Sequence, residues 1–325
     1  MKKVLFISHY NYHKEIINTL KELGYDVTFY NDKPNDSFLY KFAGRYKINF
    51  FNSFFANYYD KIIEKTKNVK FDYVFLINAE YIPLHSLNNL RERNKESVFI
   101  LYMWDSISNK GATKEKLKFF DYCYSFDTYD VNHTEELTLM PLFYIKNFHP
   151  IVKNKYDYDI AFVGTAHDDR PKIINQVKEQ CEKAGRKIYC FLYSPHVLVY
   201  MYTKLTNKNY KGIHAREMSF EKIPYAVTAE IYQNSKCVID IENSGQSGLT
   251  IRTIEILGLK KKLITTNKEI IKYDFYNSNN IMVVDRENFI IDFEFVDKPF
   301  VDLPNNIYES YSLRSRLKEI FEKSI

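Results

Sequence analysis

The stretch with the clearest chemical potential runs from Gln246 to Glu255 and reads QSGLTIRTIE. It comes shortly after the apolar run Cys237–Ile241 and continues into Ile256 and Leu257. A short strand, a small polar turn with Gly and a helix that opens with Thr, Arg and Glu can offer backbone N–H groups to a phosphate and a carboxylate to a ribose. The stretch therefore predicts a nucleotide-linked ligand.

Within this stretch, Arg252 and Glu255 are three residues apart on one predicted helix, so they share a face. One of them can meet a diphosphate while the other accepts ribose hydroxyls. Ser247, Gly248 and Thr250 lie at the predicted helix start, where the phosphates would rest. The alternative is an intrahelical ion pair between Arg252 and Glu255 on a solvated turn.

A second loop of this kind runs from Gly164 to Arg170 and separates a buried strand from a helix that opens at Pro171. A Gly that frees the backbone and a Pro at the first helical position are features of an anion-binding loop. His167 or Arg170 would be its charged partner. The alternative is an ordinary strand-to-helix turn with an Asp cap.

Three titratable side chains in the first half of the chain each follow a predicted strand: His9, Glu80 and Asp105. An imidazole or carboxylate at such a position can take a proton from an acceptor hydroxyl. We expect Asp105 to be the first choice for this base. For each of these residues, as for Asp127, a helix N-cap or turn carboxylate is the competing interpretation.

Other kinds of chemistry lack their motifs in this sequence. The eight His residues show no HExxH pattern, and the adjacent Asp168 and Asp169 do not form the isolated DxD of a metal-dependent transferase. The four Cys residues are widely spaced, and no GxSxG, Walker A or GxGxxG motif occurs. We therefore expect no metal and no cofactor, and we disfavour a hydrolase, a P-loop NTPase and a dinucleotide-dependent enzyme.

Apolar runs alternate with helical periodicity along the chain, which predicts parallel sheets covered on both faces. At 325 residues the chain is long enough for two domains. The Pro-containing segment Met140–Pro150 has no clear periodicity, so we place the boundary there, with an N-terminal domain over 1–150 and a C-terminal domain over 151–325 that includes a final helix over Asn305–Lys323. The predicted strands are Val4–Ser8, Asp26–Tyr30, Tyr73–Asn78, Val98–Met103, Tyr122–Phe126, Ile160–Val163, Lys187–Leu192, Cys237–Ile241, Leu263–Thr266 and Ile281–Val284.

Composition adds few constraints. The net charge of +5 fits a chain that meets phosphates or an anionic membrane surface, and it also fits an ordinary solvated surface. Aromatic residues make up 17% of the chain, which we attribute to Phe and Tyr in the cores. The N-terminal apolar run ends at Ser8, and no other run approaches the length needed to span a bilayer, so we expect a cytoplasmic protein whose membrane contact, if any, is peripheral.

With these motifs in place, the chain resembles the two-domain GT-B glycosyltransferases, and in particular bacterial surface-polysaccharide (capsule and lipopolysaccharide) and spore-maturation-like members. The resemblance implies an α/β fold in which two doubly wound Rossmann-like domains face a cleft, with acceptor-side chemistry in the first domain and the nucleotide-sugar donor in the second. It rests on Gly24–Val27, Tyr102–Ser106, Ser125–Asp127, Phe162–Gly164, Gln246–Glu255 and Lys261–Asn267.

The common GT-B signature places one Glu on the donor sugar and a second Glu, eight residues later, on the ribose. In this sequence the second Glu corresponds to Glu255, while Ser247 stands at the position of the first. The resemblance therefore implies ribose binding by Glu255 but does not imply a retaining mechanism. An inverting reaction would need a base in the first domain, which Asp105, His9 or Glu80 would supply.

The resemblance implies a metal-independent transferase that moves a sugar from a nucleotide-diphosphate sugar to a glycan or lipid-linked acceptor, with no role for nucleic acid. One alternative is another GT-B enzyme, such as a sugar-nucleotide epimerase or a polyol-phosphate transferase. Another is a nucleotide-sugar-binding protein that has lost catalysis, which the Ser at position 247 favours.

Overall fold

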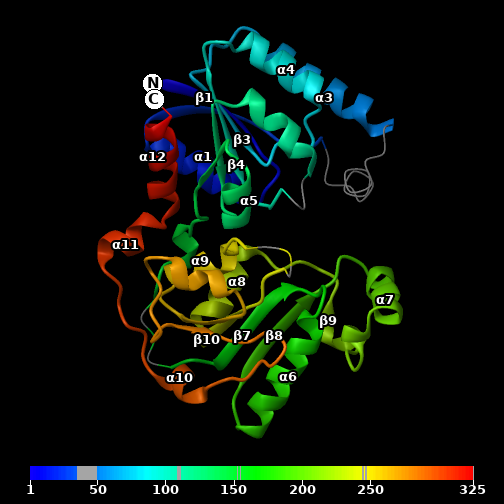
Figure 1. The fold of residues 1–325 in the computed structure, drawn as a ribbon, viewed down its shortest axis with the longest axis vertical. Helices are drawn as coiled ribbons and strands as arrows, with labels where there is room; N and C mark the ends of the chain where they lie inside the picture. Colours follow the sequence, from blue (N-terminus) through cyan, green and yellow to red (C-terminus); the bar gives the residue numbers. More distant parts are fainter. Residues whose placement is uncertain are drawn as a thin grey trace. The chain divides into compact units, whose positions relative to one another are not determined.

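The computed structural model describes residues 1–34, 50–107, 111–151, 153, 155–243, 245 and 247–324. The chain divides into two compact units, each built on a parallel six-stranded sheet (Figure 1). The first unit comprises Met1–Leu142 and Leu313–Ile325, and the second comprises Phe143–Ser312. This confirms the α/β class and the pair of doubly wound sheets expected from the sequence.

The sheet of the first unit has the strand order β2-β1-β3-β4-β5-β6. Its central strands are continuous apolar runs with no exposed face: β3 is buried along its whole length, as parallel strands covered by helices on both sides must be. The order reverses between β1 and β3, where doubly wound sheets bind ligands. The strands are β1 (Lys2–Ile7), β2 (Tyr25–Tyr30), β3 (Tyr73–Ile77), β4 (Val98–Met103), β5 (Tyr122–Ser125) and β6 (Leu137–Leu139).

The connections of the first unit are helical. They are α1 (His13–Glu22), α3 (Phe50–Thr66), α4 (Leu84–Arg93), the 3-10 helix η1 (Gly111–Phe119) and α5 (Thr128–His133).

The sheet of the second unit has the order β12-β11-β10-β7-β8-β9, and its switch point lies between β7 and β10. Residues at the carboxyl ends of these two strands are therefore placed next to each other. The strands are β7 (Tyr158–Thr165), β8 (Ile188–Tyr193), β9 (Met218–Ser219), β10 (Ser235–Asp240), β11 (Lys262–Thr265) and β12 (Ile281–Val283).

The helices of the second unit are α6 (Arg170–Lys183), α7 (Val197–Thr206), α8 (Tyr225–Gln233), α9 (Ile251–Gly258), α10 (Phe293–Asp297) and α11 (Asn305–Ser310), with short 3-10 turns η2 (Lys146–Phe148), η3 (Lys208–Tyr210), η4 (Ala215–Glu217) and η5 (Lys268–Lys272). None of the helices in the described part of the chain is long and apolar enough to cross a membrane.

Aromatic side chains fill the interiors of both units, as the composition indicated. In the first unit Phe6 stacks on Phe75 at 5.3 Å between ring centroids, and both are fully buried. In the second unit Phe162 is fully buried in the core cluster that includes Ile173 and Val177 of α6. The high aromatic content therefore serves packing to a large extent.

The C-terminal tail differs from the expectation in two ways. It forms two helices, α11 and α12 (Leu313–Lys323), because Tyr311 and Ser312 leave the helical path and pair with the backbone of Tyr144. In addition, α12 belongs to the first unit, not to the C-terminal domain. The ring of Phe321 packs against Tyr25, Tyr73 and Phe75, with centroid distances of 4.9, 5.0 and 5.5 Å.

The division between the units also falls earlier than position 150, because Tyr144 and Phe148 pack into the second unit. Their close approach depends on Gly258 at the end of α9. A β-carbon at that position would lie 2.5 Å from the Tyr144 ring and 2.6 Å from the Phe148 carbonyl oxygen.

Candidate functional site

A pocket of about 230 Å³ opens at the carboxyl ends of β7 and β8, against α8 and the first turn of α9. This is the edge at which open α/β sheets bind ligands. The lining residues are Val163, Gly164, Thr165, Phe191, Tyr193, Lys222, Ile223, Thr228, Tyr232, Ile251, Arg252 and Glu255. The pocket thus combines aromatic and apolar walls with a few charged groups, as nucleotide sites do.

The start of α9 is organised by Asp240, the last residue of β10. Its Oδ2 accepts hydrogen bonds from the hydroxyls of Thr250 (2.6 Å) and Thr253 (2.7 Å). The Thr250 Oγ1 in turn accepts from the backbone N–H of Thr253, so Thr250 is the N-cap of the helix. Sequence reasoning did not single out Asp240, although a carboxylate that ends an apolar strand was the available signal.

Arg252 is held in the pocket wall by three neighbours. Its Nη1 lies 2.6 Å from Asp240 Oδ1, its Nε donates to the Tyr232 hydroxyl at 3.1 Å, and its guanidinium lies 5.6 Å from the centroid of the Phe162 ring. Burial by itself lowers the pKa of Arg252, but Tyr232 and Asp240 raise the pKa above its ordinary value. The group is therefore a fixed, permanently charged cation.

The remaining nitrogen of Arg252, Nη2, lies beside Gly164. A β-carbon built on Gly164 would lie 3.1 Å from Nη2 and 2.8 Å from the Phe162 ring, which is too close for an unshifted side chain. The absence of a side chain at position 164 thus makes room for the guanidinium. Glu255 lies on the same helix, is buried and also lines the pocket. The two residues do not lie on a solvated turn, since Glu255 is buried and Arg252 pairs with buried Asp240.

Arg170 and His167 do not line the pocket. Arg170 is buried and braces its own loop, because Nε donates to the Ile241 carbonyl (2.8 Å) and Nη1 to the Thr165 carbonyl (3.2 Å) and to His167 Nε2 (2.8 Å). Burial and the nearby Arg252 lower the pKa of Arg170 to about 10. Burial and Arg170 also lower the pKa of His167. The two side chains are therefore tied into their own loop, and their role as anion-binding partners stays a prediction.

The pocket is not lined by Ser247, Gly248 or Thr250. The carbonyl oxygens of Ser247 and Gly248 accept hydrogen bonds from Asn267 Nδ2 at 3.2 and 3.3 Å. Thr250 caps α9, as described above. Gln246 lies outside the described residues. Of the eight donor-site residues expected from the sequence, Gly164, Arg252 and Glu255 line the pocket, and the expectation missed Tyr193, Lys222 and Tyr232.

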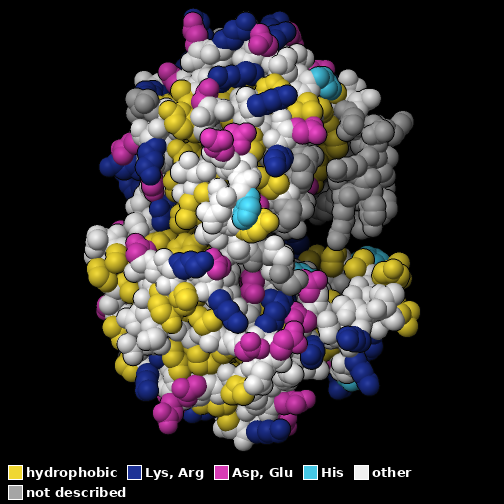
Figure 2. Space-filling model, in the orientation of Figure 1, with side chains coloured by type: hydrophobic (Ala, Val, Ile, Leu, Met, Phe, Trp, Pro, Cys, Tyr) yellow, Lys and Arg dark blue, Asp and Glu magenta, His cyan; other side chains and the backbone are white. Residues whose placement is uncertain are grey.

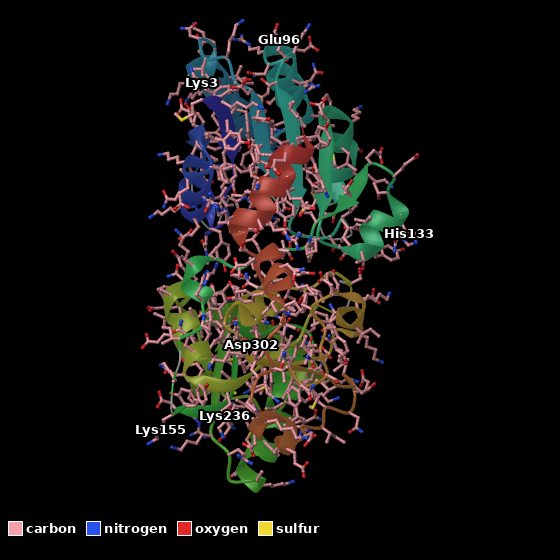
Figure 3. All side chains as sticks on the ribbon, turned by 90° about the vertical axis from the view of Figure 1, so that its left-hand side faces the viewer. Lys3, Glu96, His133, Lys155, Lys236 and Asp302 are labelled. Carbon is pink, nitrogen blue, oxygen red and sulfur yellow. The ribbon has the colours of Figure 1, made fainter. Side chains whose placement is uncertain are left out.

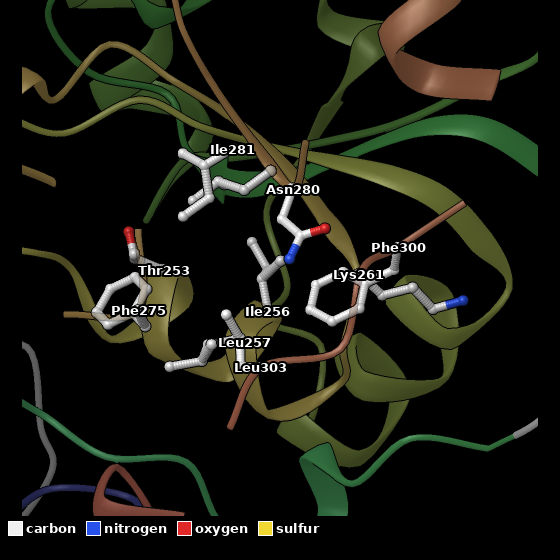
Figure 4. Close-up of a pocket in the computed structure, with 10 residues that line it drawn as sticks. Thr253, Ile256, Leu257, Lys261, Phe275, Asn280, Ile281, Phe300 and Leu303 are labelled. Atoms are coloured by element: carbon white, nitrogen blue, oxygen red, sulfur yellow. The ribbon is translucent and has the colours of Figure 1, made fainter. Parts of the chain in front are cut away.

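A second, small cavity of about 10 Å³ lies beside α9 and is lined by Ile256, Leu257 and Phe275 (Figure 4). Its size is that of about one water molecule. The amide of Asn280 at its edge is already paired with the backbone of Val301, through bonds of 2.7 and 2.8 Å. This cavity is a gap in the packing and not a ligand site.

In the first unit, the carboxyl ends of the strands gather the three titratable residues expected there. His9 follows β1, with Nδ1 3.3 Å from Asp32 Oδ2 and Nε2 3.9 Å from Glu80 Oε2. Asp32 is fully buried and also accepts from the Tyr59 hydroxyl. Burial acts to raise the pKa of Asp32, but the bonds from His9 and Tyr59 outweigh it and hold the pKa below its usual value. An Nδ1–H donated to this carboxylate leaves Nε2 as the proton acceptor.

Asp105 occupies a different environment from His9. Its Oδ2 accepts hydrogen bonds from the Tyr10 hydroxyl at 2.6 Å and from Asn78 Nδ2 at 3.1 Å. Burial and the neighbouring Asp105 raise the pKa of Tyr10, so Tyr10 remains a hydrogen-bond donor to the carboxylate. The Asn78 Oδ1 accepts from the backbone N–H of Trp104 at 2.6 Å, which ties the ends of β3 and β4 together.

Glu80 is presented by a turn in which Asn78 and Ala79 both have left-handed backbones, with φ of 60° and 48°. Lys116 of η1 fixes this turn, since its Nζ donates to the carbonyls of Ala79 (2.6 Å) and Glu80 (3.1 Å). Burial lowers the pKa of Lys116 to about 8. Strained backbone of this kind is found mainly at functional sites, and sequence reasoning did not identify Lys116.

Asp127, the third carboxylate of this unit that the sequence indicated, is a helix cap. Its side chain accepts from the backbone N–H groups of Tyr129 and Asp130 at the start of α5. Across the described residues there is no group of three or more His, Cys, Asp or Glu side chains arranged to hold a metal ion.

No protein-family model and no curated protein sequence matches this chain. Solved structures, however, match it over almost its whole length. HepE from Anabaena, in complex with UDP-glucose, has a TM-score of 0.61 at 9% identity and covers 99% of both chains. The lipopolysaccharide outer core galactosyltransferase WaaB has a TM-score of 0.55 at 10% identity, covering 99% of this chain and 100% of that one.

The UDP-GlcNAc 2-epimerase of Methanocaldococcus jannaschii, in complex with UDP-GlcNAc and UDP, has a TM-score of 0.54 at 13% identity, with 99% and 100% of the two chains covered. Similarity at these identities describes the fold alone. Together with the two doubly wound sheets, it shows that the chain has the GT-B fold that its sequence resemblance predicted.

Proposed function

We propose that the chain is a glycosyltransferase that moves a sugar from a nucleotide-diphosphate sugar to a glycan or lipid-linked acceptor. The observation that carries the proposal is the pocket in which Gly164, Arg252 and Glu255 meet at the carboxyl edge of the second sheet. The HepE and epimerase structures, which share the fold, are complexes with UDP-glucose and with UDP-GlcNAc and UDP. A nucleotide sugar is therefore the ligand class to test first.

In this proposal each group of the pocket has a role. The carboxylate of Glu255 accepts the ribose hydroxyls, and the Nη2 edge of Arg252 contacts the diphosphate. The backbone at Gly164 and the first turn of α9 add N–H groups to the same phosphates. Fixed positive charge at this place stabilises the leaving diphosphate as its bond to the sugar breaks, and no metal is needed for that role.

The proposed transfer is an inverting displacement. The acceptor oxygen forms a bond to the anomeric carbon, the bond between that carbon and the diphosphate oxygen breaks, and the acceptor proton passes to a base. We assign the base to His9 Nε2, because Asp32 holds the other ring nitrogen, whereas Asp105 already accepts from Tyr10. Ser247 in place of a sugar-contacting carboxylate agrees with this outcome.

The finer identity of the substrates remains part of the proposal. The fold similarity to WaaB favours bacterial surface-polysaccharide synthesis at the cytoplasmic side of a membrane. A second candidate, a sugar-nucleotide epimerase, is favoured by the similar TM-score of the Methanocaldococcus enzyme. An epimerase converts the nucleotide sugar without an acceptor, whereas a transferase releases the nucleoside diphosphate only as sugar moves to acceptor or water.

Calorimetric titration of the full chain with UDP, ADP and GDP, and with their sugars, tests the proposal. We expect Arg252→Ala and Glu255→Ala each to weaken nucleoside diphosphate binding by about tenfold to hundredfold, since each removes a charged partner. Glu269→Ala serves as the control, because Glu269 forms a surface ion pair with Lys272 away from the pocket. Unchanged affinity in both pocket variants, or no binding of any nucleotide by the wild type, would refute the site.

A further inference from the structure

The helix α7 carries an apolar stripe on its solvent side. Leu198, Met201, Tyr202 and Leu205 have exposed fractions of 65, 53, 69 and 87%. They occupy positions i, i+3, i+4 and i+7, so they form one continuous face of the helix. In a globular protein such a face ordinarily turns into the core, and here it turns away from it.

Contacts on the opposite side of α7 hold the helix with its apolar stripe outward. Tyr200 is buried, and its hydroxyl donates to the Ile213 carbonyl at 3.0 Å. Lys204 Nζ donates to the same carbonyl at 2.7 Å and lies 5.7 Å from the centroid of the Tyr200 ring. The helix is thus docked onto η3 and the turn after it, with the apolar stripe left outward.

The segment that carries the stripe and follows it is basic, although Asp168 lies beside its end, where the Asp168 carbonyl accepts from Asn207 and Asn209. No Asp or Glu occurs in the sequence from Lys183 to Arg216, whereas Lys208, Lys211 and Arg216 follow α7 and are exposed. Figure 2 shows hydrophobic side chains together with Lys or Arg side chains over α7 and the segment after it. An outward apolar stripe beside cations is complementary to a surface that presents hydrocarbon beneath negative charge.

We propose that α7 docks the second unit onto the surface of an anionic lipid bilayer. The stripe enters the boundary between headgroups and acyl chains, and the cations after the helix contact lipid phosphates. A second copy of this chain fits the stripe less well than a lipid surface does. It would bring the same basic segment against itself, and a helix about 15 Å long and about 10 Å wide offers far less than the roughly 800 Å² per partner of a stable interface.

Vesicle co-sedimentation of the full chain tests the docking. We expect binding to vesicles of phosphatidylcholine mixed with phosphatidylglycerol, weaker binding to phosphatidylcholine alone, and a fall to that weaker level at high salt, which screens the charges. The variant L198S/Y202S/L205S should bind at least about tenfold more weakly, because it removes most of the buried apolar area. K208E/K211E should lose the preference for phosphatidylglycerol.

The matched control is I271S/I290S, which removes two exposed apolar side chains elsewhere on the second unit and should bind as the wild type does. Thermal melting and nucleotide titration verify that each variant is folded. Because nucleotide binding is measured separately, failure of the donor site and failure of docking are distinguishable. Wild-type protein that ignores anionic vesicles, a stripe variant that binds unchanged, or self-association lost in the stripe variant would each overturn the proposal.

Discussion

Gly164 and Arg252 lie so close together that a side chain at position 164 would displace the guanidinium. A β-carbon there would lie 3.1 Å from Arg252 Nη2 and 2.8 Å from the Phe162 ring on which the guanidinium rests. Gly164 lies at the end of β7, the first strand of the unit's sheet, and Arg252 lies in the first turn of the helix after β10. The two predicted phosphate loops are therefore in contact through Gly164 and Arg252. A substitution in one loop should change the position of side chains in the other.

Gly164→Ala should weaken nucleoside diphosphate binding by about tenfold, because Arg252 must move or the methyl group must be accommodated at a cost of about 1–3 kcal/mol. Calorimetric titration measures the affinity. Gly245→Ala is the matched control, since a β-carbon at Gly245 meets nothing within 4 Å. Equal affinities for the two variants would contradict the role assigned to Gly164.

Asp240→Asn should lower the free energy of unfolding by about 3–5 kcal/mol, because it leaves the buried Arg252 cation without its counter-charge. Urea unfolding measures this change. Asp302→Asn is the control, since Asp302, labelled in Figure 3, also lies 2.6 Å from a cation but has a side chain that is 76% exposed. An exposed pair contributes about 0–1 kcal/mol, so similar losses for both variants would show that burial is not decisive.

Asp32→Asn should reduce kcat by about 10²-fold or more while nucleotide affinity stays unchanged. The substitution removes the carboxylate that orients His9, and the nucleotide pocket lies in the other unit. His9→Ala should have at least the same effect. Steady-state kinetics combined with calorimetric titration separates the two quantities, and circular dichroism verifies the fold. Full turnover in His9→Ala would show that His9 is not the base, and Glu80 and Asp105 would then be the candidates for it.

Lys116→Met should abolish a pH dependence of stability between about pH 8 and the ordinary lysine pKa. Burial lowers the pKa of Lys116 to about 8 in the folded state, so over this interval the unfolded chain binds more protons than the folded chain. The free energy of unfolding must then rise with pH, by roughly 3 kcal/mol in total for this group. Urea unfolding across the interval measures the slope, and Lys118→Met, on the exposed side of η1, should retain it.

Chelation should leave turnover unchanged under the proposed mechanism, because Arg252 and backbone N–H groups carry the leaving-group charge. The measurement is nucleoside diphosphate release before and after EDTA treatment, with magnesium added back in a third sample. A loss on chelation that magnesium restores would mean that a metal ion shares this role.

Local sequence pattern was sufficient for the α/β class and for the two parallel sheets. Continuous apolar runs such as Tyr73–Ile77 can be satisfied only by strands that are covered on both faces, and the carboxyl end of each run marks where a polar side chain emerges. This is why the pattern of residues alone could predict that His9, Asp105 and Gly164 lie at the ends of strands and that Arg252 and Glu255 share a helix. Residue type and spacing indicate which residues are buried and which local conformation they adopt. Both properties depend mainly on residues that are close in the sequence.

Tertiary structure decided which hydrogen-bond and ion-pair partners these side chains have, and whether each side chain lines the pocket. The pairing of Arg252 with Asp240, of His9 with Asp32 and of Asp105 with Tyr10 depends on strand order, which no local pattern contains. The same holds for Arg170, which became a brace within the fold, and for α12, which left the C-terminal domain to cover the first sheet. Contacts between residues distant in sequence set these outcomes, because only the folded chain brings their side chains together.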